Sequence, residues 1–260
     1  MNRRNFLSLS TLAGAGFAFG HCTQAPKTHF ITLSFDDGFK RSFYRIAEIF
    51  ENHGLSACFN VIASGHLDSF NTTDAWIGPA ILGDFDDWNT LKSRGHEVMP
   101  HSWEHLNLTK VSLEKAKENV DKCLDYFEAN LEGYISGEAV YNFAYNASNP
   151  LIEDYILQRT SAVRTGGWLM LKDRRANLLS ETKKLGCWGQ GPDNCDDYVE
   201  KEINDFLNTS GGWLILNLHG LDNEGWGPIS TRYLDRLLHR LVRLPQVSVR
   251  PAGEILKVHT

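Results

Sequence analysis

Short β-rich runs alternate with helical segments along most of the 260-residue chain, and this alternation constrains the fold more than any other feature. Strands that are separated by helices pair in parallel, because each helix returns the chain to the same end of the sheet. The apolar runs predict seven strands, at residues 29–35, 57–62, 96–99, 140–145, 161–164, 213–218 and 247–249. Helical spacing predicts helices at 39–53, 84–93, 113–131 and 233–242. The pattern therefore predicts an α/β fold with a mostly parallel sheet.

Nucleotide-binding motifs do not accompany this pattern. No Gly-x-Gly-x-x-Gly follows the first strand, and the chain has no Gly-x-x-x-x-Gly-Lys-Ser/Thr sequence. About seven strands in 260 residues fit a single-domain (β/α) barrel better than a dinucleotide-binding fold. The net charge is -6, and no basic tract interleaves with aromatic residues. We therefore expect no nucleic-acid partner.

The first 26 residues do not fit the alternating pattern, and we expect the domain to span residues 27–260. Arg3 and Arg4 precede an apolar run, residues 12–20, that is shorter than a membrane-spanning helix. This start resembles a bacterial twin-arginine export signal. We expect a periplasmic or cell-surface protein; the alternative is a short basic tail. Cys22 is a candidate for lipid attachment to a membrane, although His21 stands where such signals have a small residue.

The remaining cysteines give no zinc-ribbon pattern, because none of them forms a Cys-x-x-Cys pair. Cys187 and Cys195 flank a short loop, residues 188–194. In an oxidising compartment they could form a local disulfide. Two free thiols are the alternative.

Polar residues follow two of the predicted strands in a pattern that suits a metal ion. Asp36 and Asp37 follow the first strand, although Asp-Asp-Gly is also a common turn sequence. His101 and His105 follow the third strand, and their spacing predicts that both imidazoles share one face of a helical turn. Two histidines and a strand-end carboxylate would leave open positions, as in catalytic metal sites. We expect one divalent ion, with zinc first and cobalt, nickel, manganese or iron as alternatives.

A third polar strand end is His219, which closes the apolar strand at residues 213–218. In a parallel barrel the chemistry takes place at the carboxyl ends of the strands, where all three clusters fall. His219 is therefore a candidate proton donor.

These three segments, in this order, resemble the polysaccharide deacetylases of the NodB-homology type, carbohydrate esterase family 4 (CE4). Their signature has a Phe-Asp-Asp-Gly segment, matched at 35–38, and a His-Ser/Thr-x-x-His segment, matched at 101–105. A Leu-x-Leu-His strand follows, matched at 216–219. The resemblance covers roughly residues 28–250 and implies a distorted, incomplete (β/α) barrel.

The resemblance also implies an activity and a role for each matched residue. Asp36 corresponds to the general base, and Asp37, His101 and His105 to the metal ligands. His219 corresponds to the general acid. The implied reaction is the metal-dependent hydrolysis of N- or O-linked acetyl groups on a carbohydrate polymer or oligosaccharide. The alternative is a non-catalytic, carbohydrate-binding relic of the same fold.

One family segment, Arg-x-Pro-Tyr, is not matched. Ala144 and Asn146 stand at its Arg and Pro positions, so the group that orients Asp36 is in doubt. Arg164, on the next predicted strand, is the candidate substitute, because a planar guanidinium holds a carboxylate in a fixed orientation. We therefore expect Arg164 to contact Asp36; the alternative for Arg164 is a surface salt bridge.

Aromatic residues near the expected site are candidates for contact with the sugar, since aromatic faces stack on sugar rings. They are Trp103, Tyr145, Trp168 and Trp226. Acidic residues in the loop 221–227 could bind sugar hydroxyls. Packing in the core is the alternative for the tryptophans.

Overall fold

The computed structural model describes residues 27–167, 176–179 and 183–259. The expected export signal, Cys22 and Trp168 lie outside these residues. The strands are β1 (His29–Phe35), β2 (Cys58–Val61), β3 (Glu97–Pro100), β4 (Val140–Asn142), β5 (Ala162–Gly166), β6 (Lys184–Cys187), β7 (Gly212–Leu218) and β8 (Val247–Val249). The α-helices are α1 (Lys40–Asn52), α2 (Phe85–Ser93), α3 (Leu113–Asn130), α4 (Pro150–Ile156), α5 (Asp196–Leu207), α6 (Thr231–Leu241) and α7 (Ala252–His259).

The strands form two parallel sheets that together make the distorted, incomplete barrel expected from the sequence. One sheet has the order β3-β2-β1-β7, and the other has the order β4-β5-β6. β8 pairs with the amino-terminal half of β1, whereas β2 pairs with its carboxyl-terminal end. An isolated bridge from Trp188 to Leu216 joins the end of β6 to β7. Between β4 and β3 the link is a side chain, since Asn142 donates to the Pro100 carbonyl oxygen at 3.3 Å.

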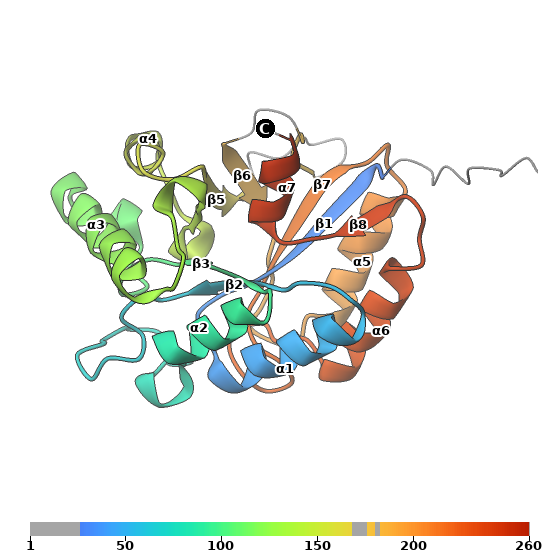
Figure 1. Cartoon of the computed structure of the whole chain (residues 1–260), viewed down its shortest axis with the longest axis horizontal. Coiled ribbons are helices and arrows are strands. Elements are labelled where there is room, and N and C mark those ends of the chain that lie inside the picture. The colour runs from blue at the N-terminus through green and yellow to red at the C-terminus, as the bar shows by residue number, and fades with distance from the viewer. Residues whose placement is uncertain (1–26, 168–175, 180–182, 260) are drawn as a thin grey trace, which may run out of the picture.

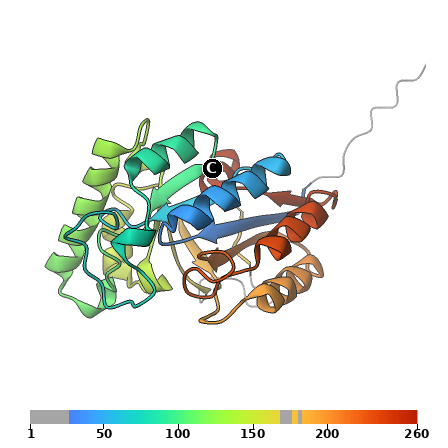
Figure 2. The same ribbon diagram turned by 90° about the horizontal axis from the view of Figure 1, so that it is seen from below.

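Helices cover the outside of the strands (Figure 1). α1 buries Phe43, Ile46 and Phe50, which lie on the apolar face that the spacing predicted. Figure 2 shows α1 between α2 and α6. None of the helices in the described ranges is long and apolar enough to cross a membrane.

Each predicted strand is present, but the strand predicted at 140–145 ends at Asn142. A short 3-10 turn follows, in which Tyr145 has a φ of 58° that no strand can accommodate. Sequence reasoning missed four elements, namely β6, α4, α5 and α7. α4 carried a readable signal, because Asn149 caps it and Pro150 begins it. β6 has only four residues, which is too short for its periodicity to be recognised.

Cys187 and Cys195 are free thiols in this structure, so the local disulfide is not formed. The Cys187 thiol lies 3.2 Å from the side-chain oxygen of Asn146. The Cys195 thiol lies 2.9 Å from the Gln190 carbonyl oxygen. Both thiols therefore have polar partners of their own.

Candidate active site

The carboxyl ends of the parallel strands meet at one pocket, and the polar clusters of the sequence come together there. Asp36 and Asp37 follow β1, and the Asp36 amide still donates to the Leu218 carbonyl oxygen at 2.8 Å. His101 follows β3, and His219 follows β7. All four of these polar side chains line a cavity of about 340 Å³.

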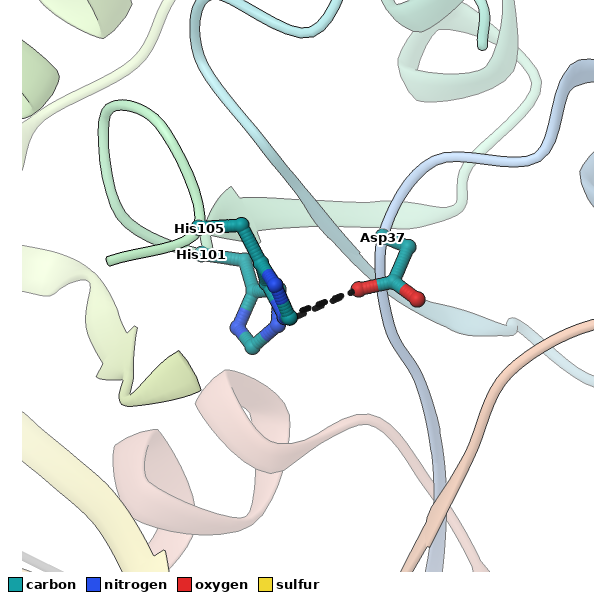
Figure 3. Close-up of side chains that lie close together, drawn as sticks. All are labelled: Asp37, His101 and His105. Atoms are coloured by element: carbon teal, nitrogen blue, oxygen red, sulfur yellow. Dashed lines mark ion pairs between the residues drawn. The ribbon is translucent and has the colours of Figure 1, made fainter. Parts of the chain in front are cut away.

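Asp37, His101 and His105 point toward one another in this pocket (Figure 3). The Nε2 atoms of both histidines lie 3.4 Å from Oδ1 of Asp37. One potential ligand atom from each residue lies within 4.8 Å of the other two. Two ligand atoms that are each about 2.1 Å from a tetrahedral zinc ion are roughly 3.4 Å apart. The two distances to Asp37 therefore fit a single tetrahedral ion.

The hydrogen bonds of the two imidazoles involve Nδ1 and leave Nε2 available to bind an ion. Nδ1 of His101 donates to the Asn142 carbonyl oxygen at 3.0 Å, and Nδ1 of His105 donates to the Asp74 carboxylate at 2.6 Å. Because these oxygens only accept, Nδ1 carries a proton in each ring, and Nε2, which faces Asp37, is the nitrogen available to an ion. Both oxygens of Asp37 are buried and have no hydrogen-bond partner within the described part of the chain. Such an unpaired buried carboxylate is costly unless a cation binds it, so the three residues fit a metal site.

The backbone around these ligands is strained, and one expectation about it was wrong. Residues 101–105 do not form a helical turn; the chain bends at residues 103–105. Ser102 has a φ of 65° and His105 a φ of 54°, so the chain cannot continue as a right-handed helix. Asp37 has a φ of 78°. Left-handed backbone at non-glycine residues is costly and is concentrated at functional sites.

Asp36 is held by three donors from three strands. Asn60 Nδ2 donates to its Oδ1 at 2.7 Å. Arg164 Nη2 and Asn217 Nδ2 each donate to its Oδ2 at 2.6 Å. The expected contact between Arg164 and Asp36 is therefore present. Arg164 is 1% exposed, so it is not a surface salt bridge.

The second Arg164 amino group, Nη1, lies 3.2 Å from the Ser34 hydroxyl oxygen, which also accepts from Asn60 at 2.7 Å. Sequence reasoning did not identify Asn60 or Asn217. A polar residue within the apolar strands 57–62 and 213–218 was the available signal, because a buried amide needs a partner.

Both neighbouring carboxyl groups have a lowered pKa although both are buried. Burial raises the pKa of Asp36, but the charges of Arg164, His101 and His219 outweigh it. Burial also raises the pKa of Asp37, but interactions with His105 and His101 outweigh it. A cation in the site would act in the same direction. Both groups are therefore carboxylates at neutral pH.

His219 stands on the β7 side of the same pocket. Burial lowers its pKa, and the carboxylates of Asp37 and Asp36 partly counter this effect. Its Nδ1 is buried without a hydrogen-bond partner among the described residues. The ring meets Trp226 edge-on, with centroids 5.5 Å apart. His219 thus has a nitrogen that none of the described protein groups occupies.

The aromatic candidates divide into two groups. Tyr145 and Trp226 line the pocket, as expected of residues that contact a substrate. Trp103 does not line it; the ring packs edge-on against Tyr126, with centroids 5.3 Å apart, at the margin of the core. Trp76 lines the pocket and was not predicted. It lies in the long segment between β2 and α2, at a strand's carboxyl end, where active-site loops are expected.

The acidic residues of the loop 221–227 bind the protein itself. Asp222 accepts from the Thr231 amide at 2.9 Å, at the start of α6. Glu224 accepts from the Ser42 amide at 3.1 Å and from the Ser42 hydroxyl. These contacts hold the loop in place, and neither acid is among the residues that line the pocket.

Comparison with solved structures shows the same fold at low sequence identity. The CE4 domain of a multidomain xylanase from the hindgut metagenome of Trinervitermes trinervoides matches with a TM-score of 0.54 and 13% identity, over 89% of this chain and 91% of that one. A peptidoglycan deacetylase from Bacillus subtilis matches with a TM-score of 0.56 and 15% identity, over 90% and 93%. A CE4 family pseudoenzyme from Bacillus anthracis matches with a TM-score of 0.54 and 12% identity, over 89% and 66%.

Comparison of sequences identifies the family directly. No curated protein matches this sequence. The family model described as "Polysaccharide deacetylase" matches residues 23–155, which are 133 of the 260 residues and include the first two motifs. This chain belongs to the polysaccharide deacetylase family.

Proposed function

We propose that the protein is a metal-dependent hydrolase that removes acetyl groups from a carbohydrate. The observation that carries this proposal is the pairing of two different carboxylates in one pocket. Asp37 has no hydrogen-bond partner among the described residues, and its Oδ1 faces two histidine nitrogens, whereas Asp36 is held by Arg164. One carboxylate is thus arranged for a cation and the other for a proton.

Different side chains of the pocket have different roles in the proposed acetyl hydrolysis. Asp37, His101 and His105 would hold the cation, for which zinc is our first choice and cobalt, nickel, manganese or iron are alternatives. A divalent cation here supplies Lewis acidity, which acidifies water and polarises a carbonyl group. Asp36 is ionised and accepts the proton of the attacking water.

His219, in its protonated form, donates a proton to the leaving amine or alcohol. It lines the same pocket as Asp36, so both proton-transfer groups can reach one substrate. Tyr145, Trp226 and Trp76 offer aromatic faces on which a sugar ring can stack.

A non-catalytic carbohydrate-binding protein is the second candidate. Ala144 in place of the family's arginine favours it, and a solved structure of similar fold is described as a CE4 family pseudoenzyme. The contact between Arg164 and Asp36 weighs against it, because β5 supplies the base with an orienting guanidinium. We therefore favour the enzyme.

The substrate test should include both amide and ester linkages. A solved structure of similar fold is a peptidoglycan deacetylase, and another belongs to a xylanase. We would measure acetate release from N-acetylated glycans, such as peptidoglycan and chitin oligomers, and from acetylated xylan. We expect release from at least one of them, loss of release with a chelator, and recovery on adding zinc. Binding of a glycan without acetate release from any substrate would favour the non-catalytic candidate.

We also propose that residues 1–26 direct export and that the domain spans residues 27–260. This proposal rests on the paired arginines and the short apolar run in the sequence. Cell fractionation and the N-terminal sequence of the mature protein test it. Substitution of both arginines by lysine should retain the protein in the cytoplasm, and labelling with a radioactive fatty acid would reveal a lipid on Cys22.

A further inference from the structure

Asp74 bonds to two residues of the pocket, His105 and Tyr145, that lie far from it in the sequence. It lies in the segment between β2 and α2 and is 8% exposed. Its Oδ2 accepts from His105 Nδ1 at 2.6 Å, from the Tyr145 hydroxyl at 2.5 Å and from the Thr72 hydroxyl at 3.2 Å. One carboxylate oxygen therefore links the candidate metal ligand His105, the pocket residue Tyr145 and Thr72 of its own loop.

The contact with His105 fixes how that imidazole meets the cation site. A carboxylate that accepts from Nδ1 holds the ring in one orientation and increases the basicity of the other nitrogen. Here that other nitrogen is the one that lies 3.4 Å from Asp37. His105 is itself part of the strained bend, and the bond from its Nδ1 to Asp74 holds the ring.

The contact with Tyr145 fixes one wall of the pocket. Tyr145 is 45% exposed, so about half of its side chain is open to solvent. Its hydroxyl is anchored by Asp74, and its ring lies against His105 with centroids 4.7 Å apart. The segment that contains Asp74 also contains Trp76, which lines the pocket. Within this segment the Ile77 amide donates to the Asp74 carbonyl oxygen at 3.2 Å.

We propose that Asp74 is a positioning residue that couples the metal ligand His105 to the aromatic wall formed by Tyr145. It fixes the imidazole for the cation and the phenol ring for the sugar. The second effect rests on the proposed function, whereas the first requires only that a divalent cation binds.

The test compares Asp74→Asn with Tyr145→Phe, because each removes a different part of the arrangement. Zinc affinity is measured by calorimetry on the metal-free protein without carbohydrate. Asp74→Asn should weaken zinc binding about 10- to 100-fold, as changes to such outer partners do. Tyr145→Phe should leave zinc affinity within about twofold of the wild type but raise KM for the acetylated substrate roughly three- to tenfold, with a smaller change in kcat.

A matched control is Asp235→Asn, since Asp235 pairs with His53 at 2.9 Å on an exposed surface outside the pocket. It should change neither zinc affinity nor KM. Circular dichroism verifies that each variant is folded. If Asp74→Asn does not fold, Asp74→Glu replaces it. The longer carboxylate of Asp74→Glu should give a higher zinc affinity than Asp74→Ala.

Wild-type zinc affinity in Asp74→Asn, or no difference between Asp74→Glu and Asp74→Ala, would overturn the proposal. It would also be overturned if Tyr145→Phe weakened zinc binding as much as Asp74→Asn. If the wild type binds zinc but releases no acetate from any substrate, the proposed function fails while the effect of Asp74 on zinc affinity can still be measured.

Discussion

A carboxyl group lies at each end of the parallel strands, and the pKa values of the two groups are shifted in opposite directions. Asp36 lies at the carboxyl end of β1 beside Arg164, and its pKa is below the usual value. Glu97 begins β3 at the opposite end, where it accepts from the Gly253 amide at 2.7 Å and contacts the Cys58 thiol at 3.2 Å. Burial raises the pKa of Glu97 to about 7, and Glu254 adds to this effect.

This comparison shows that burial alone does not determine the charge of a carboxyl group. Burial raises the pKa at both ends, but only Asp36 has a guanidinium in direct contact. Neutral donors, such as the amide and the thiol at Glu97, lower the pKa too little to outweigh burial. At Asp36 the neighbouring cation is what outweighs burial and keeps the carboxyl group ionised at neutral pH.

The largest difference should appear when each carboxyl group is replaced by an amide. Asp36→Asn should reduce kcat by about 10²- to 10⁴-fold, because it removes the proton acceptor. Glu97→Gln should leave kcat unchanged. Metal content should be normal in both, since neither residue belongs to the candidate metal triad. Loss of metal from Asp36→Asn together with full metal content in Asp37→Ala would mean that the two aspartates have exchanged roles.

Replacement of Arg164 by lysine tests whether the charge alone is sufficient. Lysine keeps the positive charge but cannot reproduce the guanidinium contacts with Asp36 and Ser34. A lost charge-assisted contact of about 1.5–3 kcal/mol should reduce kcat/KM roughly 10- to 100-fold. Steady-state kinetics checks this value, with elemental analysis as the control for metal content. Wild-type kcat/KM in Arg164→Lys would show that orientation by the guanidinium is unimportant.

Removal of the neutral donor Asn217 should have a smaller effect. Asn217→Leu removes one hydrogen bond to Asp36 but leaves Arg164 and Asn60 in place. We expect kcat/KM to fall about tenfold, which corresponds to about 1.4 kcal/mol. A decrease as large as that of Arg164→Lys would contradict the view that the cation dominates.

The ionisation of Glu97 should affect the stability of the protein rather than its activity. Its folded-state pKa of about 7 exceeds the usual 4.5, so the folded protein binds this proton more tightly than the unfolded chain does. The stabilisation is complete below pH 4.5 and is lost as the pH rises through about 7. Between about pH 5 and pH 8, the free energy of unfolding should fall by on the order of 1–2 kcal/mol more in the wild type than in Glu97→Gln. Urea titrations at several pH values measure this difference, and parallel curves for the two proteins would refute it.

The sequence predicted the parts of the site that lie at strand ends. Apolar runs located the strands, and parallel pairing then brought Asp37, His101 and His219 to one edge. The family pattern supplied individual roles, and the missing arginine led to Arg164. β1 and β5 belong to different sheets, and Arg164 reaches Asp36 across the interior between them.

Other parts of the site depended on contacts that no local pattern encodes. Asp74 lies in an irregular loop and meets His105, 31 positions later, only in the folded chain. Trp76 enters the pocket from the same loop. The spacing of His101 and His105 correctly indicated proximity but predicted a helical turn, whereas the left-handed residues 102 and 105 produce a bend.

Metal content tests the central claim most directly, because the proposed chemistry depends on the candidate metal site. The wild type and a variant with both His101→Ala and His105→Ala are purified under identical conditions, checked for folding and analysed for bound metals. We predict one divalent ion per wild-type chain and none in the double variant, because the variant retains a single ligand side chain, Asp37. Equal metal content in the two folded proteins would contradict the account.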